Sequence, residues 1–278
     1  MNPVDPVLVD SVQAAAHAAP PAEELPNFIT VLEHLFPKSS VMHFFVRWEN
    51  IVFSLGVLGF ITYTALRAAQ KKSFLPKGVQ NVWEIIVEGI ESFVTSILGP
   101  KGLEHVPFLG TLFVYILLQN WLGMIPLMKS PTSAWSTTIA LALTSTVYVQ
   151  WVGIKEHGLI NYVKHLAGNP VGVLGLVLVP LMLVINLSIE YLAVPLSLSL
   201  RLFANVSSED KLLYKFAELN VMYWGLPFAF QIFANVLVIL FSLVQAFVFL
   251  LLSTVYISLI MPHEEEHSSH ETAKGLTH

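Results

Sequence analysis

The apolar stretch near the end of the chain, residues 227–261, most limits what this sequence can fold into. It contains no Asp, Glu, Lys, Arg or His. A helix needs about 20 apolar residues to cross a bilayer, and it satisfies its backbone hydrogen bonds internally. The whole chain is 55% hydrophobic and 12% charged. These features predict an all-α integral membrane protein.

Further apolar stretches of spanning length precede this one. Together they predict five transmembrane helices, at about 51–69, 106–127, 136–152, 171–205 and 226–261. The last two exceed the length of a perpendicular span, so we expect a long, tilted hairpin with kinks at Pro180 and Pro195. Residues 79–98 alternate apolar and polar faces at helical spacing, which predicts one interfacial amphipathic helix on the cytoplasmic side.

The segments outside the spans divide the chain into three parts. We expect a polar extramembrane segment at 1–42, a membrane domain at 43–262 and an acidic cytoplasmic tail at 263–278. The first span is followed by Arg67, Lys71, Lys72 and Lys77. By the positive-inside bias, this end is cytoplasmic, the N-terminus is outside and the C-terminus is in the cytoplasm.

Arg201 is the charge that the apolar spans least readily tolerate. It stands in Ser-Leu-Ser-Leu-Arg-Leu-Phe-Ala-Asn, residues 197–205. Intramembrane charges usually face water or protein and mark functional sites, although a structural arginine bonded to carbonyls of a neighbouring helix is the alternative. Polar residues recur at helical spacing on each of the last two spans, which predicts two stripes facing water or each other. They are Asn186, Glu190, Ser197, Arg201 and Asn205, then Gln231, Asn235, Ser242 and Gln245.

Other function classes find little support. The net charge of −5 gives no indication of nucleic-acid binding, and no cysteine is available for disulfides or thiolate metal sites. His263 to His267 fits the H-E-x-x-H pattern, but it lies in the acidic tail, so we expect no metal site. The chain has no Gly-rich phosphate loop, so we expect neither bound ATP nor another cofactor.

The chain resembles subunit a of F-type ATP synthase in four stretches. They are the arginine motif, Gln-Ala-Phe-Val-Phe at 245–249, Tyr-Ile-Ser-Leu at 256–259 and the run 113–126. The resemblance implies a non-catalytic stator subunit in a bacterial-type inner (plasma) membrane. Its implied partners are the c-ring, the peripheral-stalk b subunits, the rest of the complex and the lipid bilayer.

The resemblance also implies roles for single residues in translocating protons or Na⁺. Arg201 would separate two half-channels and face the c-ring carboxylates. Asp210 and Glu209 would serve the outer half-channel, and Glu190 the inner one. The remaining polar residues would line the ion pathway: Asn186, Ser197, Asn205, Gln231, Asn235 and Gln245.

This sequence departs in three places from many members of the family that it resembles. Ala204 stands where many have Gly, and Val238 where many carry a His or an acid. Leu187 stands where many have an acid, so the inner half-channel role is carried over to Glu190 from a position about one turn earlier. A second hypothesis is a secondary transporter that binds an anionic substrate through Arg201, but the internal repeat typical of such proteins is not evident.

Overall fold

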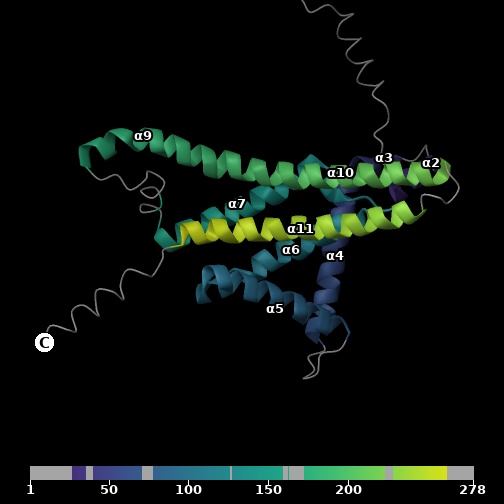
Figure 1. Cartoon of the computed structure of the whole chain (residues 1–278), viewed down its shortest axis with the longest axis horizontal. Helices are drawn as coiled ribbons and strands as arrows, with labels where there is room; N and C mark the ends of the chain where they lie inside the picture. The colour runs from purple at the N-terminus through teal and green to yellow at the C-terminus, as the bar shows by residue number, and fades with distance from the viewer. Residues whose placement is uncertain are drawn as a thin grey trace, which may run out of the picture.

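We describe a computed structural model that covers residues 27–35, 40–70, 78–125, 127–158, 162, 172–222 and 228–261. Regular structure in these ranges is entirely helical (Figure 1). The tail beyond residue 261 and the whole segment before residue 27 lie outside them.

Four helices in the described ranges are long and apolar enough to cross a membrane: Glu49–Gln70 (α4), Trp135–His157 (α7), Val179–Phe216 and Ile232–Ile260. This confirms the all-helical membrane class. The predicted second span appears as α6, Val106–Leu122, which is apolar but shorter than the other four. A count of five spans therefore stays a prediction.

The fourth apolar segment extends further than the sequence predicted. It comprises α9 (Gly172–Ser188), the π-helix η3 (Ile189–Ala193) and α10 (Val194–Met222). We expected the span to end near Asn205, where charged residues begin. No Gly or Pro occurs between Val206 and Met222, so the helix continues after the apolar pattern stops.

The π-helix has a local cause in the sequence. Pro195 has no N–H, and its ring crowds the carbonyl four residues earlier, that of Tyr191. One turn with i→i+5 bonding relieves this crowding, and η3 ends two residues before the proline. The irregularity expected at Pro195 thus takes the form of a π-helix, while Pro180 lies inside α9.

The last two long helices form a hairpin, with α11 (Phe228–Ile260) beside α10 and α4 running across their direction (Figure 1). Helix α7 packs on α10, and α6 packs on α11. One face of α10 enters a buried apolar core shared with α6, α7 and α11. Its members include Ile116, Ala142, Leu198, Leu202, Val206 and Phe249.

The amphipathic helix α5, Val79–Leu98, has the bounds that its periodicity predicted. Ile90 and Val94 are buried, and the Phe93 ring lies 4.9 Å from the ring of Phe247 in α11. Gly99 ends the helix with φ 69°, and its N–H donates to Thr95 O. The short η1 (Pro100–Glu104) leads into α6. That α5 lies at a membrane interface remains a prediction.

Three short helices complete the described chain. They are α2 (Phe28–Leu35), α3 (Ser40–Arg47) and η2 (Pro131–Ser133). The end of the segment expected to be polar is thus helical, and it exposes Phe28 and Val41. The backbone N–H of Phe28 donates to Leu127 O at 2.7 Å, which attaches α2 to the α6–α7 connection.

Candidate functional site

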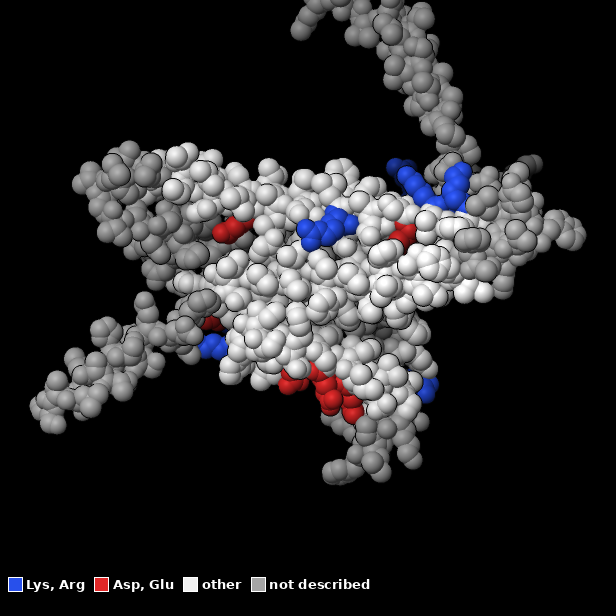
Figure 2. Space-filling view, in the orientation of Figure 1, with Lys and Arg blue, Asp and Glu red and all other residues white. Residues whose placement is uncertain are grey.

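Arg201 lies on the outward face of α10. It is exposed, as are Ser197 and Ala204 near it, whereas Leu198 and Leu202 are buried against the rest of the chain. It makes no hydrogen bond or ion pair with another described residue, so the structural-arginine alternative finds no support in this part of the chain. Figure 2 shows basic surface about midway along the long helix formed by α9, η3 and α10, bordered by uncharged surface.

Glu209 faces the interior, two turns beyond Arg201. It is 7% exposed, and its carboxylate accepts two hydrogen bonds. Asn205 Nδ2 donates to Oε1 at 2.8 Å, and Ser242 Oγ of α11 donates to Oε2 at 2.9 Å. The buried acid therefore joins the two helices of the hairpin. It brings together three of the predicted polar residues, Asn205 and Glu209 on α10 and Ser242 on α11.

Asp210, the neighbouring acid, lies beside the end of α6. A Cβ added to Gly123 would lie 3.2 Å from Asp210 Oδ1 and 3.0 Å from Ser130 Cβ. Glycine at this position thus leaves room for the carboxylate. Ser130 Oγ donates to Gln119 O at 3.0 Å and hydrogen-bonds Thr132 Oγ1 at 2.8 Å, so Asp210 borders a buried polar cluster.

That polar cluster contains side-chain atoms without a partner among the described residues. Gln119 Nε2 donates to Ser54 Oγ at 2.8 Å, and Thr132 Oγ1 donates to Asn120 Oδ1 at 2.7 Å. Gln119 Oε1, Asn120 Nδ2 and Trp121 Nε1 are buried and have no such partner. Buried polar atoms of this kind usually bind ordered water.

Glu190 lies at the other end of the site, in the π-helix, and points toward α7. Gln150 Nε2 donates to Glu190 Oε2 at 3.2 Å, and Tyr162 OH lies 3.3 Å from the same oxygen. The tyrosine hydroxyl also donates to Gln150 Oε1. Burial and the nearby carboxylate raise the pKa of Tyr162, which keeps it a proton donor to this pair.

A cavity of about 190 Å³ opens beside Glu190, between α7, η3–α10 and α11. Its polar wall contains Ser145, Thr146 and Gln150, and its apolar wall includes Tyr256 and Leu259. A space of this size, with several hydrogen-bonding groups, suits a small cluster of waters. Sequence reasoning missed Gln150 and Tyr162, because a lone polar residue on a helix or a loop carries no distinctive spacing.

The predicted stripe on this helix is divided by the π-helix. One extra residue per turn rotates everything before it by about 100° relative to an unbroken α-helix. Ser197 and Arg201 are exposed, whereas Glu190, like Asn186, is half-buried. On α11, Ser242 and Gln245 are buried and Asn235 is half-buried, so this stripe faces the protein; the Gln231 side chain lies outside what the structure describes.

These features define a multi-pass helical membrane protein with an outward-facing arginine between two inward-facing acids. The family profile described as ATP synthase A chain matches residues 50–258. ATP synthase subunit a of Protochlamydia amoebophila is 43% identical over 250 residues, covering 87% of this chain and 91% of the relative. That of Solidesulfovibrio magneticus is 35% identical over 232 residues, covering 82% and 91%.

The chain therefore belongs to the ATP synthase subunit a family. It is a non-catalytic subunit of the membrane sector of the F-type complex, on the stator side. Bacterial relatives and several apolar helices agree with a multi-pass protein of the inner membrane.

Proposed function

We propose that this chain provides two offset half-channels that carry protons to and from the carboxylates of a c-ring, with Arg201 separating them. One observation carries the proposal. Arg201 is exposed and has no partner among the described residues, while Glu190 and Glu209 on either side turn toward polar groups inside the chain. The arginine is thus available to an external acid, and the internal acids are held by polar groups inside the chain.

Charge physics explains why a fixed arginine suits this position. Its guanidinium stays protonated, and a cation held in a low-dielectric medium stabilises an ionised carboxylate that passes in front of it. It also repels a cation that would cross directly between the half-channels. Each elementary charge moved down a potential of 100 mV yields about 2.3 kcal/mol, which can bias the rotation of a ring of acids.

The outer half-channel would run past Glu209 and Asp210. Glu209 lies 8 residues beyond Arg201, or about 12 Å along α10 and about 80° around it. Asn205 and Ser242 hold its carboxylate, and Asp210 borders the cluster with unpartnered atoms at Gln119 and Asn120. Water bound there would extend the route toward the outer surface. Gln231, Asn235 and Gln245 would hydrate it from α11.

The inner half-channel would contain Glu190 and the cavity beside it. Glu190 lies 11 residues before Arg201, about 16 Å along the helix. Gln150 and Tyr162 hold the carboxylate at the cavity wall. The π-helix turns this acid away from the arginine face and toward Gln150 of α7, which supports the assignment because it places the carboxylate at the cavity.

The remaining assignments follow from this arrangement. We propose that α6 crosses the membrane as a fifth span, with the N-terminus outside and the C-terminus in the cytoplasm. The partners are the c-ring against the Arg201 face and the peripheral-stalk b subunits elsewhere. The coupling ion is H⁺ or Na⁺, since its ligands belong to the ring; ATP-driven pumping measured with and without sodium decides between them.

Replacing Arg201 tests the proposal. In the assembled complex, Arg201→Ala is expected to abolish ion-driven ATP synthesis, whereas Lys215→Ala on the same helix retains it. The double variant Glu209→Ala/Asp210→Ala should also abolish synthesis. Normal coupling in Arg201→Ala would refute the separator role, and normal coupling in the double variant would refute the outer route. A transporter would instead lose uptake of an anionic solute in Arg201→Ala without needing a c-ring.

A further inference from the structure

An apolar groove lies away from the translocation site, between α2, α3 and the first turn of α4. Its volume is about 510 Å³, and apolar side chains line it: Phe28, Ile29, Leu32, Val41, Met42, Phe45, Val52 and Phe53. We propose that this groove binds one acyl chain of a membrane phospholipid, whose phosphate lies beside Arg47.

The position of the groove indicates the chemistry of its ligand. Val52 and Phe53 belong to α4, a helix that is long and apolar enough to cross a membrane. The groove therefore opens near one end of that span, where acyl chains meet headgroups. Phe44 is 59% exposed and Trp48 44%, next to the groove in sequence. Exposed aromatic side chains at the end of a spanning helix are typical of a membrane interface.

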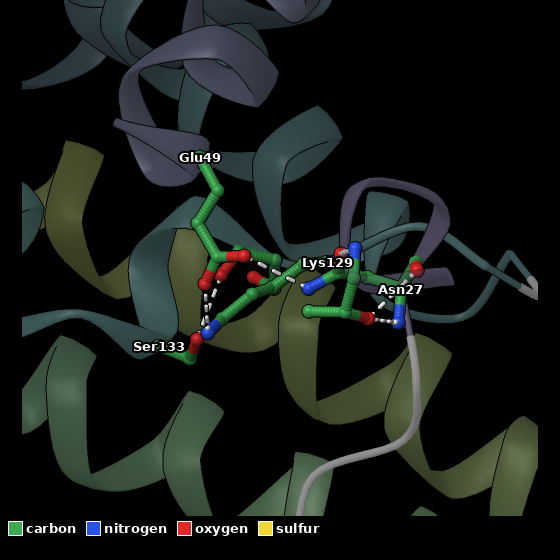
Figure 3. Close-up of polar contacts among 6 residues, drawn as sticks. Asn27, Glu49, Lys129 and Ser133 are labelled. Atoms are coloured by element: carbon green, nitrogen blue, oxygen red, sulfur yellow. Dashed lines mark hydrogen bonds and ion pairs between the residues drawn. The ribbon is translucent and has the colours of Figure 1, made fainter. Parts of the chain in front are cut away.

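A polar clamp holds the groove walls together before any ligand binds. Asn27 and Thr30 cap α2 reciprocally, each backbone N–H donating to the other side chain at 2.9 Å. Asn27 Nδ2 also donates to Glu49 Oε2 at 3.0 Å, and Glu49 pairs with Lys129 at 2.7 Å (Figure 3). Because α2 is thereby fixed to α4, little ordering cost opposes binding.

The charges near the groove favour a phosphate in one place. Glu49 and Lys129 neutralise each other, and their side chains are 14% and 18% exposed. Glu33 pairs with His43 at 3.4 Å. Arg47 is the last residue of α3 and stands two residues before α4, at the corner between two helices that line the groove. It is exposed and makes no ion pair with another described residue. Its guanidinium suits phosphate oxygens, with which it can form two parallel hydrogen bonds.

Photolabelling tests the groove in the intact complex. The complex is reconstituted into vesicles of phosphatidylethanolamine and phosphatidylglycerol that contain phosphatidylglycerol with a diazirine on its acyl chain. After irradiation, mass spectrometry should find label on peptides spanning residues 28–32 and 41–53. Even labelling of all exposed apolar helices, without enrichment here, would overturn the proposal.

A matched pair of variants makes the test specific. Val52→Trp fills the groove, whereas Leu55→Trp adds the same ring at a 60% exposed position on the same helix. Val52→Trp should lower labelling of the α2 and α3 peptides by about tenfold, the loss expected when two methylenes leave the groove. Leu55→Trp should leave it unchanged, and equal labelling in both variants would overturn the proposal.

The headgroup contact is tested without altering the groove. Arg47→Gln should lower labelling of the groove peptides by the phosphatidylglycerol probe, while labelling by an uncharged alkyl diazirine stays unchanged. Identical labelling by the phospholipid probe in Arg47→Gln and in the unaltered complex would overturn the phosphate contact. Label on another protein of the complex, with none on the groove peptides, would indicate that a protein covers the groove and would overturn the proposal.

Discussion

The Glu49–Lys129 pair offers a prediction whose size follows from the geometry. The carboxylate of Glu49 accepts from Lys129 Nζ at 2.7 Å and from Asn27 Nδ2 at 3.0 Å. It thereby joins α2, α4 and the α6–α7 connection (Figure 3). Lys129→Met keeps most of the lysine volume but leaves a carboxylate, 14% exposed, with only a neutral donor.

Breaking one side of a fully buried ion pair costs about 3–5 kcal/mol. This pair retains some solvent contact, so we expect Lys129→Met to lower the free energy of unfolding by about 2–3 kcal/mol. Glu49→Gln/Lys129→Met removes both charges and still offers Asn27 an acceptor. The double variant should therefore be more stable than Lys129→Met alone, by about 1–2 kcal/mol.

The assay is a titration of the full chain, folded in dodecyl maltoside micelles, with sodium dodecyl sulfate, followed by the emission of its 6 tryptophans. Four proteins complete the cycle: the unaltered chain, each single variant and the double variant. Additive effects of the two single substitutions, or a double variant no more stable than Lys129→Met, would show that the charges do not compensate each other.

Three further predictions concern other parts of the structure. Ser242→Ala removes a donor to Glu209 and should slow proton-driven ATP synthesis about tenfold. Thr254→Ala, which removes a buried 2.8 Å bond to Leu250 O on the same helix, should change stability only, and equal rates in the two variants would contradict this. Gly153→Ala should lower the free energy of unfolding by about 1–3 kcal/mol, because the added Cβ would lie 2.6 Å from Ile260 Cγ2. An unchanged melting midpoint would contradict this prediction. Burial lowers the pKa of His105 from 6.5, so just below pH 6.5 the unfolded chain binds a proton that the folded chain lacks. The free energy of unfolding should therefore fall as pH drops below about 6.5, and His105→Gln should make it depend less on pH.

The sequence was informative about the membrane class because apolar length is a local property. The charge-free run before Met261 predicts a spanning helix without knowledge of its neighbours, and the periodicity of residues 79–98 predicts both ends of α5. The extent of the fourth helix was less predictable. Charged residues after Asn205 end an apolar pattern, yet they do not break a helix, so α10 continues to Met222.

The arrangement of the site depends on features that spacing cannot reveal. Regular α-helical spacing placed Glu190 on the same face as Arg201. One π-turn before Pro195 instead rotates Glu190 toward Gln150. The donor from Ser242 to Glu209 joins residues 33 positions apart, which requires the register of two packed helices. Arg201 itself was predictable, since a charge surrounded by apolar residues is conspicuous in any spanning segment.

Cysteine cross-linking tests most directly whether the Arg201 face of α10 meets the ring. The chain has no native cysteine, so single replacements report one position each. Ser197→Cys and Ser208→Cys are on the exposed face, whereas Ser199→Cys replaces a side chain that is 0% exposed. With a cysteine on the outward-facing surface of the c-ring, oxidation of the complex should join the first two variants to the ring and leave Ser199→Cys unlinked. Cross-linking of Ser199→Cys alone, or of none of the three in an assembled complex, would contradict the proposed interface.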